Sequence, residues 1–289
     1  EWTEASSEVS ATVRGNALGY ALEYFSGQRN WAPAHAIVDR IDQLHAEAGF
    51  GDVAKARISA RRGFYYHYRR GDYAGALEQS QRAVAFALRG GVSRAAREAG
   101  ITVTLCHLMR GEVDLAGKAL DVEERSIPDG HLMLRANVHY ERSWWLALQR
   151  DVVGAQRELD TACRLFAQID EHGVMSLATP SMQAQLLLQV GEYAAARRVF
   201  EMRTRRPDAW LVDMALIESQ EALAEGDIRR ATSALRGGLL IAARIDIKGC
   251  LWACRRELMQ LLELAQQHDI ESAWVDSTIR ARLLGVDRS

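Results

Sequence analysis

Gly71-Asp72-Tyr73-Ala74-Gly75-Ala76 is the stretch that decides the fold of this 289-residue chain, because it is the clearest copy of a turn that recurs along the sequence. Glycine readily adopts the left-handed conformation that ends a helix, and an acid at the next position can cap the helix that follows. The alanine that closes the motif lets two helices approach closely. These six residues therefore predict a tight connection between two helices.

Copies of this motif recur at nearly regular intervals. Their closing alanines lie 42, 40, 39, 41, 35 and 42 residues apart, a spacing typical of an array of helical repeats. We therefore predict a single repeat domain over residues 1–285, with turns near residues 30, 72, 112, 151, 192, 227 and 269, and a tail at 286–289. The closing alanines are Ala34, Ala76, Ala116, Ala155, Ala196, Ala231 and Ala273.

The segments between the turns have the apolar spacing of helices. Leu132, Leu134, Val138, Trp145 and Leu148 illustrate this period in the stretch before the fourth turn. No segment shows a sustained alternation of apolar and polar residues, which would indicate a strand. The chain is therefore predicted to be all-α.

Composition narrows the classes of partner. The chain is 48% hydrophobic and 26% charged, and its 36 basic residues nearly balance 38 acidic ones. No net field draws it to nucleic acid or to a membrane, and no apolar run approaches the roughly 18 residues of a membrane span. Its four cysteines lie scattered in apolar helical stretches without the spacing of a zinc site, as in reduced cytoplasmic proteins. We expect a cytoplasmic domain without a metal, a membrane segment or direct nucleic acid contact.

The turn with a second alanine seven residues on, as in Ala76/Ala83 and Ala155/Ala162, resembles the tetratricopeptide repeat. The period of about 40 residues exceeds the usual period of about 34. The resemblance implies a right-handed superhelix of about seven antiparallel helix pairs. It also implies that the first helices of the pairs line a concave groove.

The period of about 40 residues implies helices longer than those of the usual repeat. Such helices resemble the sensor domain of bacterial ATP-dependent transcriptional activators of the MalT type, in the LuxR group. The run from Ala265 to Leu284 resembles the stretch that closes the array in such activators, although Asp269 replaces a glycine and Thr278 a leucine. The resemblance implies ATPase and DNA-binding modules elsewhere in a parent chain, and the start at Glu1 is consistent with an excised segment. No phosphate-binding loop or dinucleotide fingerprint occurs, so we expect no bound cofactor.

Counting back from the closing alanines, as the repeat implies for groove positions, selects an aromatic and amide-rich surface. Such a surface suits a small polar molecule or a peptide better than DNA. The stretch from Arg61 to Arg70 could stack on a planar or sugar-like ligand, or could divide between core and solvated face. The preceding helical turn adds Asn137 and Asp213. The predicted groove residues are Arg61, Tyr65, Tyr68, Asn137, Tyr140, Trp144, Ser181, Gln185, Asp213 and Gln220.

Candidate catalytic groups are few. Cys106 beside His107 could form a nucleophile pair, but this needs a pocket and an orienting third group. Glu123 and Glu124 with Glu221 could form an acid pair for hydrolysis, but solvated helix faces explain them directly. We predict no catalytic residues and no enzyme activity.

Two functional hypotheses follow. The first is a non-catalytic sensor domain of a bacterial transcriptional regulator, which binds a small-molecule or peptide effector, or a protein partner, in its concave groove. The alternative is a constitutive scaffold that docks a segment of a partner protein and has no regulatory ligand. A pocket closed at both ends would favour the sensor, and an open continuous channel the scaffold.

Overall fold

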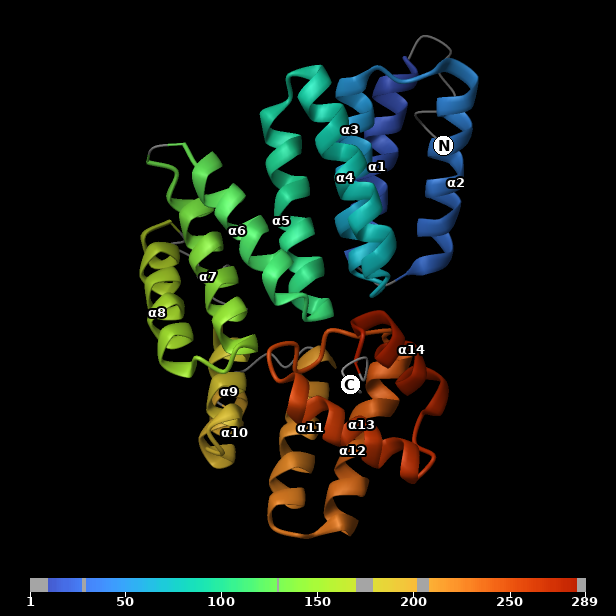
Figure 1. Cartoon of the computed structure of the whole chain (residues 1–289). Helices are drawn as coiled ribbons and strands as arrows, with labels where there is room; N and C mark the ends of the chain where they lie inside the picture. Colours follow the sequence, from blue (N-terminus) through green and yellow to red (C-terminus); the bar gives the residue numbers. More distant parts are fainter. Residues whose placement is uncertain (1–9, 28–29, 129, 170–178, 202–207, 285–289) are drawn as a thin grey trace. The chain divides into compact units, whose positions relative to one another are not determined.

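The computed structural model describes residues 10–27, 30–128, 130–169, 179–201 and 208–284. These residues form 14 α-helices and one short π-helix and contain no strand, which confirms the all-α prediction (Figure 1). The chain divides into two compact units, Glu1–Cys106 and His107–Ser289. Each unit is described by itself.

The first unit consists of consecutive helices that pack against their neighbours. α1 packs against α2, and α3 continues into the π-helix η1 and packs against α4. The π-helix lies in the arginine-rich and aromatic stretch, where Gly63 brings η1 so close to α4 that a Cβ atom would lie 2.7 Å from the Ser80 hydroxyl. The helices are α1 (Ala11–Gly27), α2 (Trp31–Ala48), α3 (Asp52–Arg61), η1 (Arg62–Tyr68), α4 (Tyr73–Gly90) and α5 (Ser93–Arg110), whose last turn belongs to the second unit.

The second unit contains the remaining helices, again packed in sequence order. α7 packs against α8, α9 against α10 and α11 against α12, and further contacts join α8 to α9 and α10 to α11. The helices are α6 (Val113–Ser126), α7 (Leu132–Leu148), α8 (Val152–Ile169), α9 (Thr179–Gln189), α10 (Tyr193–Glu201), α11 (Asp208–Ala224), α12 (Ile228–Arg244), α13 (Arg255–Gln267) and α14 (Ser272–Arg282).

Backbone hydrogen bonds explain the recurring turn. The amide of Asp72 donates to the carbonyl of His67 at 2.9 Å, and the amide of Ala76 donates to the carbonyl of Asp72 at 2.9 Å. The Asp72 carboxylate also accepts from the amide of Gly75 at 3.0 Å, so it caps α4 as predicted. Equivalent backbone bonds form at Glu112, Asp151, Glu192 and Asp227.

Not every acid of the motif caps its helix. Asp151 and Asp227 do so through their side chains, but Glu112 makes no such bond. Its longer side chain instead lies 2.7 Å from His107 Nδ1. The prediction of an acid cap therefore holds for these aspartates and not for Glu112.

Six of the seven closing alanines are fully buried, as close helix packing requires, and Ala273 is exposed. The reason is a shift of the last helix, because α14 begins two residues later than the motif predicts and follows Glu271. The amide of Val275 bonds to the Glu271 carbonyl at 3.0 Å. Val275, which is fully buried, therefore takes the place that alanine has in the other units.

Candidate functional site

Five of the predicted groove residues lie around one irregular stretch of the second unit, residues 245–254 between α12 and α13, here called the α12–α13 segment. Gln185 on α9 accepts a hydrogen bond from the amide of Ala253 at 2.8 Å. Asp213 on α11 accepts from the amide of Leu251 at 3.0 Å and from the Ser181 hydroxyl at 3.3 Å. These polar side chains therefore bind backbone of the chain itself.

Two predicted aromatic residues contact the same segment. The ring centroid of Trp144 lies 3.8 Å from that of Trp252, and the Tyr140 centroid lies 6.3 Å from it in an edge-on arrangement. The segment is buried at Cys250, Leu251, Ala253 and Cys254. A ligand at these positions would have to displace it.

A buried arginine also binds the backbone of the α12–α13 segment. Arg282 on α14 is fully buried and donates to the carbonyls of Cys250 at 2.7 Å and Trp252 at 3.1 Å. Burial raises the pKa of Asp213 to about 6, although its hydrogen bonds from Leu251 and Ser181 and the charge of Arg282 act in the opposite direction. The segment is thus fixed by backbone hydrogen bonds, aromatic contacts and a buried charge.

A separate cleft of about 680 Å³ lies in the second unit, here called the polar cleft. It is lined by the end of α9, the C-terminal half of α11 and one face of α13, together with Arg150 from the turn before α8. Of the ten predicted residues, only Gln220 lines it. A cleft of this size can hold a small organic molecule or a short peptide.

Three buried polar side chains line the polar cleft, one from each of these helices. Gln189, Gln220 and Glu257 are 8%, 8% and 7% exposed. Each has one buried oxygen without a hydrogen-bond partner among the described residues: Oε1 of each glutamine and Oε2 of Glu257. A buried acceptor without a donor is unfavourable by about 1–3 kcal/mol.

The partners of Gln189 and Glu257 fix which oxygens remain. Gln189 Nε2 donates to the carbonyls of Ala147 at 3.0 Å and Ala253 at 2.8 Å, so its Oε1 is the atom left over. Glu257 Oε1 accepts from Arg150 at 2.7 Å, which leaves Oε2.

Gln220 is held from the solvent side. Its Nε2 donates to Oε1 of Gln260 at 2.7 Å, and Gln260 is exposed. Gln260 follows Glu257 by three residues on α13, so the two lie on the same face of that helix. Gln220 and Glu257 therefore meet one face of α13.

Arg150 has an unusual backbone for its residue type. Its φ is 63°, where the corresponding residues of four other turns are glycines, Gly71, Gly111, Gly191 and Gly226, at φ between 70° and 82°. A left-handed conformation is unfavourable by roughly 1 kcal/mol for a residue with a Cβ. The Arg150 guanidinium also donates to the carbonyl of Gln189 at 2.8 Å, so it joins α9 to α13 at the polar cleft.

Arg150, Gln189 and Glu257 were not among the residues predicted from the sequence. One signal was available for Arg150, because it is the long cationic side chain at the glycine position of the turn motif. Another was available for Glu257, which precedes Leu261 by four residues and so interrupts the apolar stripe of α13. Gln189 carried no signal that separates it from other polar helix residues.

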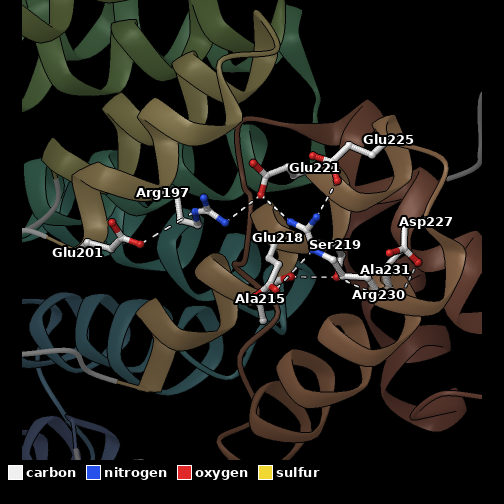
Figure 2. Close-up of polar contacts among 10 residues, drawn as sticks. All are labelled: Arg197, Glu201, Ala215, Glu218, Ser219, Glu221, Glu225, Asp227, Arg230 and Ala231. Carbon is white, nitrogen blue, oxygen red and sulfur yellow. Dashed lines mark hydrogen bonds and ion pairs between the residues drawn. The ribbon is translucent and has the colours of Figure 1, made fainter.

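Glu221, a candidate for the acid pair, lies in an ion-pair network on α10, α11 and α12 (Figure 2). Its carboxylate accepts from Arg197 at 3.0 Å and from Arg230 at 2.9 Å, and Arg230 also pairs with Glu225 at 2.6 Å. The Glu221 side chain is 13% exposed. The Glu221 carboxylate is therefore engaged in ion pairs with two guanidinium groups.

The other candidate catalytic groups also have structural partners. Glu124 pairs with Arg142 at 3.0 Å, which lowers the pKa of Glu124. Glu123 is buried rather than solvated and contacts Glu141, whose pKa is raised well above its usual value by burial and by the charge of Glu123. Cys106 is fully buried.

Three predicted residues lie in the first unit, at the end of α3 and in η1. The guanidinium carbon of Arg61 lies 3.9 Å from the ring centroid of Tyr20 on α1. The pKa of Tyr65 is raised to about 12 by burial and by its hydrogen bond with Glu23. Tyr68 stacks on Phe64 with ring centroids 5.4 Å apart.

The tenth predicted residue, Asn137, is half-buried on α7.

Across the described residues, no helix is long and apolar enough to cross a membrane, and no group of three or more histidine, cysteine, aspartate or glutamate side chains could hold a metal ion. Neither a protein-family model nor a curated protein matches the sequence.

Proposed function

We propose that this chain is a non-catalytic sensor domain that binds a small polar effector or a short peptide in the polar cleft. The observation that carries the proposal is the set of three buried oxygens, on Gln189, Gln220 and Glu257, that lack hydrogen-bond donors. A ligand with several donor groups would satisfy them. Strain at Arg150 supports the proposal, because unfavourable backbone conformations concentrate at functional sites.

Access to the buried oxygens requires a small rearrangement at the rim. Gln260 is exposed, so it can move without disturbing the core. In the proposed complex, Gln260 rotates away from Gln220 and ligand donors replace it. Arg150 keeps Glu257 oriented.

The cleft joins three successive helix pairs, those that contain α9, α11 and α13. A ligand that bridges them favours one spacing of these pairs, and it shifts the conformation only through different affinities for the two states. In a right-handed superhelix of the tetratricopeptide type, such a change alters the pitch of the array. The resemblance to MalT-type regulators suggests a cytoplasmic parent protein, whose ATPase and DNA-binding modules respond to this change.

The proposal is tested by screening polar metabolites and di- and tripeptides for binding by ligand-observed NMR, first on the intact chain. Ligands that bind are then titrated against Glu257→Gln, which places a donor where Oε2 accepts, and against Glu263→Gln, the same change at an exposed residue of the cleft. Loss of one hydrogen bond to a charged group weakens binding about tenfold or more. We expect this loss for Glu257→Gln and less than about a twofold change for Glu263→Gln.

Two results would contradict the proposal. One is the absence of any ligand from the screen. The other is an equal affinity loss in the two variants, which would indicate a general charge effect. The regulatory part is tested separately, since Glu257→Gln in a full-length parent protein should abolish the response of a transcription reporter to the ligand.

A further inference from the structure

A second cavity, of about 340 Å³, lies in the first unit among α1, α3 and the N-terminal part of α5, here called the arginine pocket. Its polar lining contains three arginines and one glutamate. The residues that matter are Asn16 and Tyr20 on α1, Arg57 and Arg61 on α3, and Arg94 and Glu98 on α5.

The positive charge of the arginine pocket is only partly balanced. Arg94 pairs with Glu98 at 2.8 Å. Arg57 and Arg61 pair with no carboxylate among the residues that the structure describes. They lie four residues apart on α3, where two like charges repel each other. An anion in the pocket would remove this repulsion.

Arg61 is held in a fixed orientation. Its guanidinium lies over the ring of Tyr20 at 3.9 Å, and Gly19 provides the space for it. A Cβ atom at Gly19 would lie 3.1 Å from Arg61 Cδ and 3.2 Å from Nη1. A guanidinium that lies over an aromatic ring can still bind a carboxylate or phosphate through two parallel hydrogen bonds from its N–H groups.

We propose that the arginine pocket binds the anionic group of a small molecule, a carboxylate or a phosphate, through the guanidinium of Arg61 with Arg57 as the second cation. The site is independent of the polar cleft, because it lies in the other unit and shares no residue with it. Arg61 was selected from the sequence as a groove residue, but its neighbours in the pocket, Arg57 and Arg94, were not.

The test uses inorganic phosphate and succinate as probes and glycerol as a neutral control, at constant ionic strength set with sodium chloride. Binding to the full chain is followed through the arginine Nε–Hε signals in NMR and through thermal shift. We expect saturable binding of at least one anion, with the Arg61 signal shifting, and no response to glycerol. Stronger binding of phosphate would identify a phosphoryl ligand, and stronger binding of succinate a carboxylate.

Three variants and one control variant define the site. Arg57→Gln and Arg61→Gln should each weaken anion binding about tenfold or more, whereas Arg82→Gln, at an exposed residue of α4, should change it less than about twofold. Arg57 is exposed, so Arg57→Gln keeps the test valid even if Arg61→Gln impairs folding. Gly19→Ala should weaken binding without any change in charge.

The proposal is wrong if neither anion binds saturably, or if Arg82→Gln weakens binding as much as Arg57→Gln. Repeating the titration in Glu257→Gln separates the two sites. Anion binding that persists there, together with loss of the effector, is the expected result. Parallel loss of both would also overturn the independence of the arginine pocket.

Discussion

Replacing Arg282 with methionine removes the charge that holds the α12–α13 segment while keeping a long, flexible side chain. The Arg282 guanidinium donates hydrogen bonds to the carbonyls of Cys250 at 2.7 Å and Trp252 at 3.1 Å. Because the donor is charged, each bond contributes about 1.5–3 kcal/mol to stability. Removing the buried charge also relieves its desolvation, which offsets part of the loss. The two hydrogen bonds together contribute about 3–6 kcal/mol, so after this offset we expect the second unit to lose about 3–5 kcal/mol of unfolding free energy.

The assay is urea unfolding followed by circular dichroism and tryptophan fluorescence, with Arg280→Met as the matched control. Arg280 lies on the same helix and is exposed, so the same substitution there removes no buried contact. At a slope of about 2 kcal/mol/M, Arg282→Met should lower the midpoint by roughly 2 M, and Arg280→Met should leave it nearly unchanged. Midpoints that fall equally in both variants would refute the role of Arg282 in fixing the segment.

Three further predictions concern other parts of the second unit. The pKa of Asp213 is raised from 3.8 to about 6, so protonation of Asp213 stabilises the folded state. As the pH rises through this range, the unfolding free energy of the wild type should fall by up to about 3 kcal/mol relative to that of Asp213→Asn. Parallel profiles of stability against pH in the two proteins would contradict this. Arg150→Gly relieves about 1 kcal/mol of backbone strain but removes the hydrogen bonds to Glu257 and Gln189. Thermal unfolding should therefore show a net loss of about 1–2 kcal/mol in stability. A gain in stability would show that these bonds are not formed in solution. Ala196→Leu should destabilise the fold by about 1–3 kcal/mol, because the larger side chain overpacks the core. Ala194→Leu, at an exposed position of the same helix, should leave stability nearly unchanged. Chemical denaturation of both variants measures the difference.

The sequence was sufficient to place the helix turns because their chemistry is local. A glycine that ends one helix and an acid that begins the next act within a few residues, and helices begin at Tyr73, Val113, Val152, Tyr193 and Ile228, each directly after the acid of the motif. The last copy of the motif predicted its helix start wrongly for an equally local reason, because α14 begins two residues later than in the other units. The shift moves Ala273 to the surface and Val275 into the core.

The environment of the predicted groove residues was not predictable, because it depends on contacts between distant segments. Gln185 and Ala253 are 68 residues apart in the sequence, and no local pattern indicates that one binds the backbone of the other. The polar cleft depends in the same way on three helices. Only Gln220, found by counting from the motif alanine, was common to the prediction and the cleft.

The most direct test of the proposed sensor function is an NMR titration of the labelled chain with a ligand from the screen. The side-chain amide signals of Gln189 and Gln220 report on the polar cleft, and the indole signal of Trp252 reports on the α12–α13 segment. We predict saturable shifts of both glutamine signals and an unchanged Trp252 indole. Shifts confined to Trp252, with the glutamine signals unmoved, would contradict binding in the polar cleft and place the ligand at the α12–α13 segment instead.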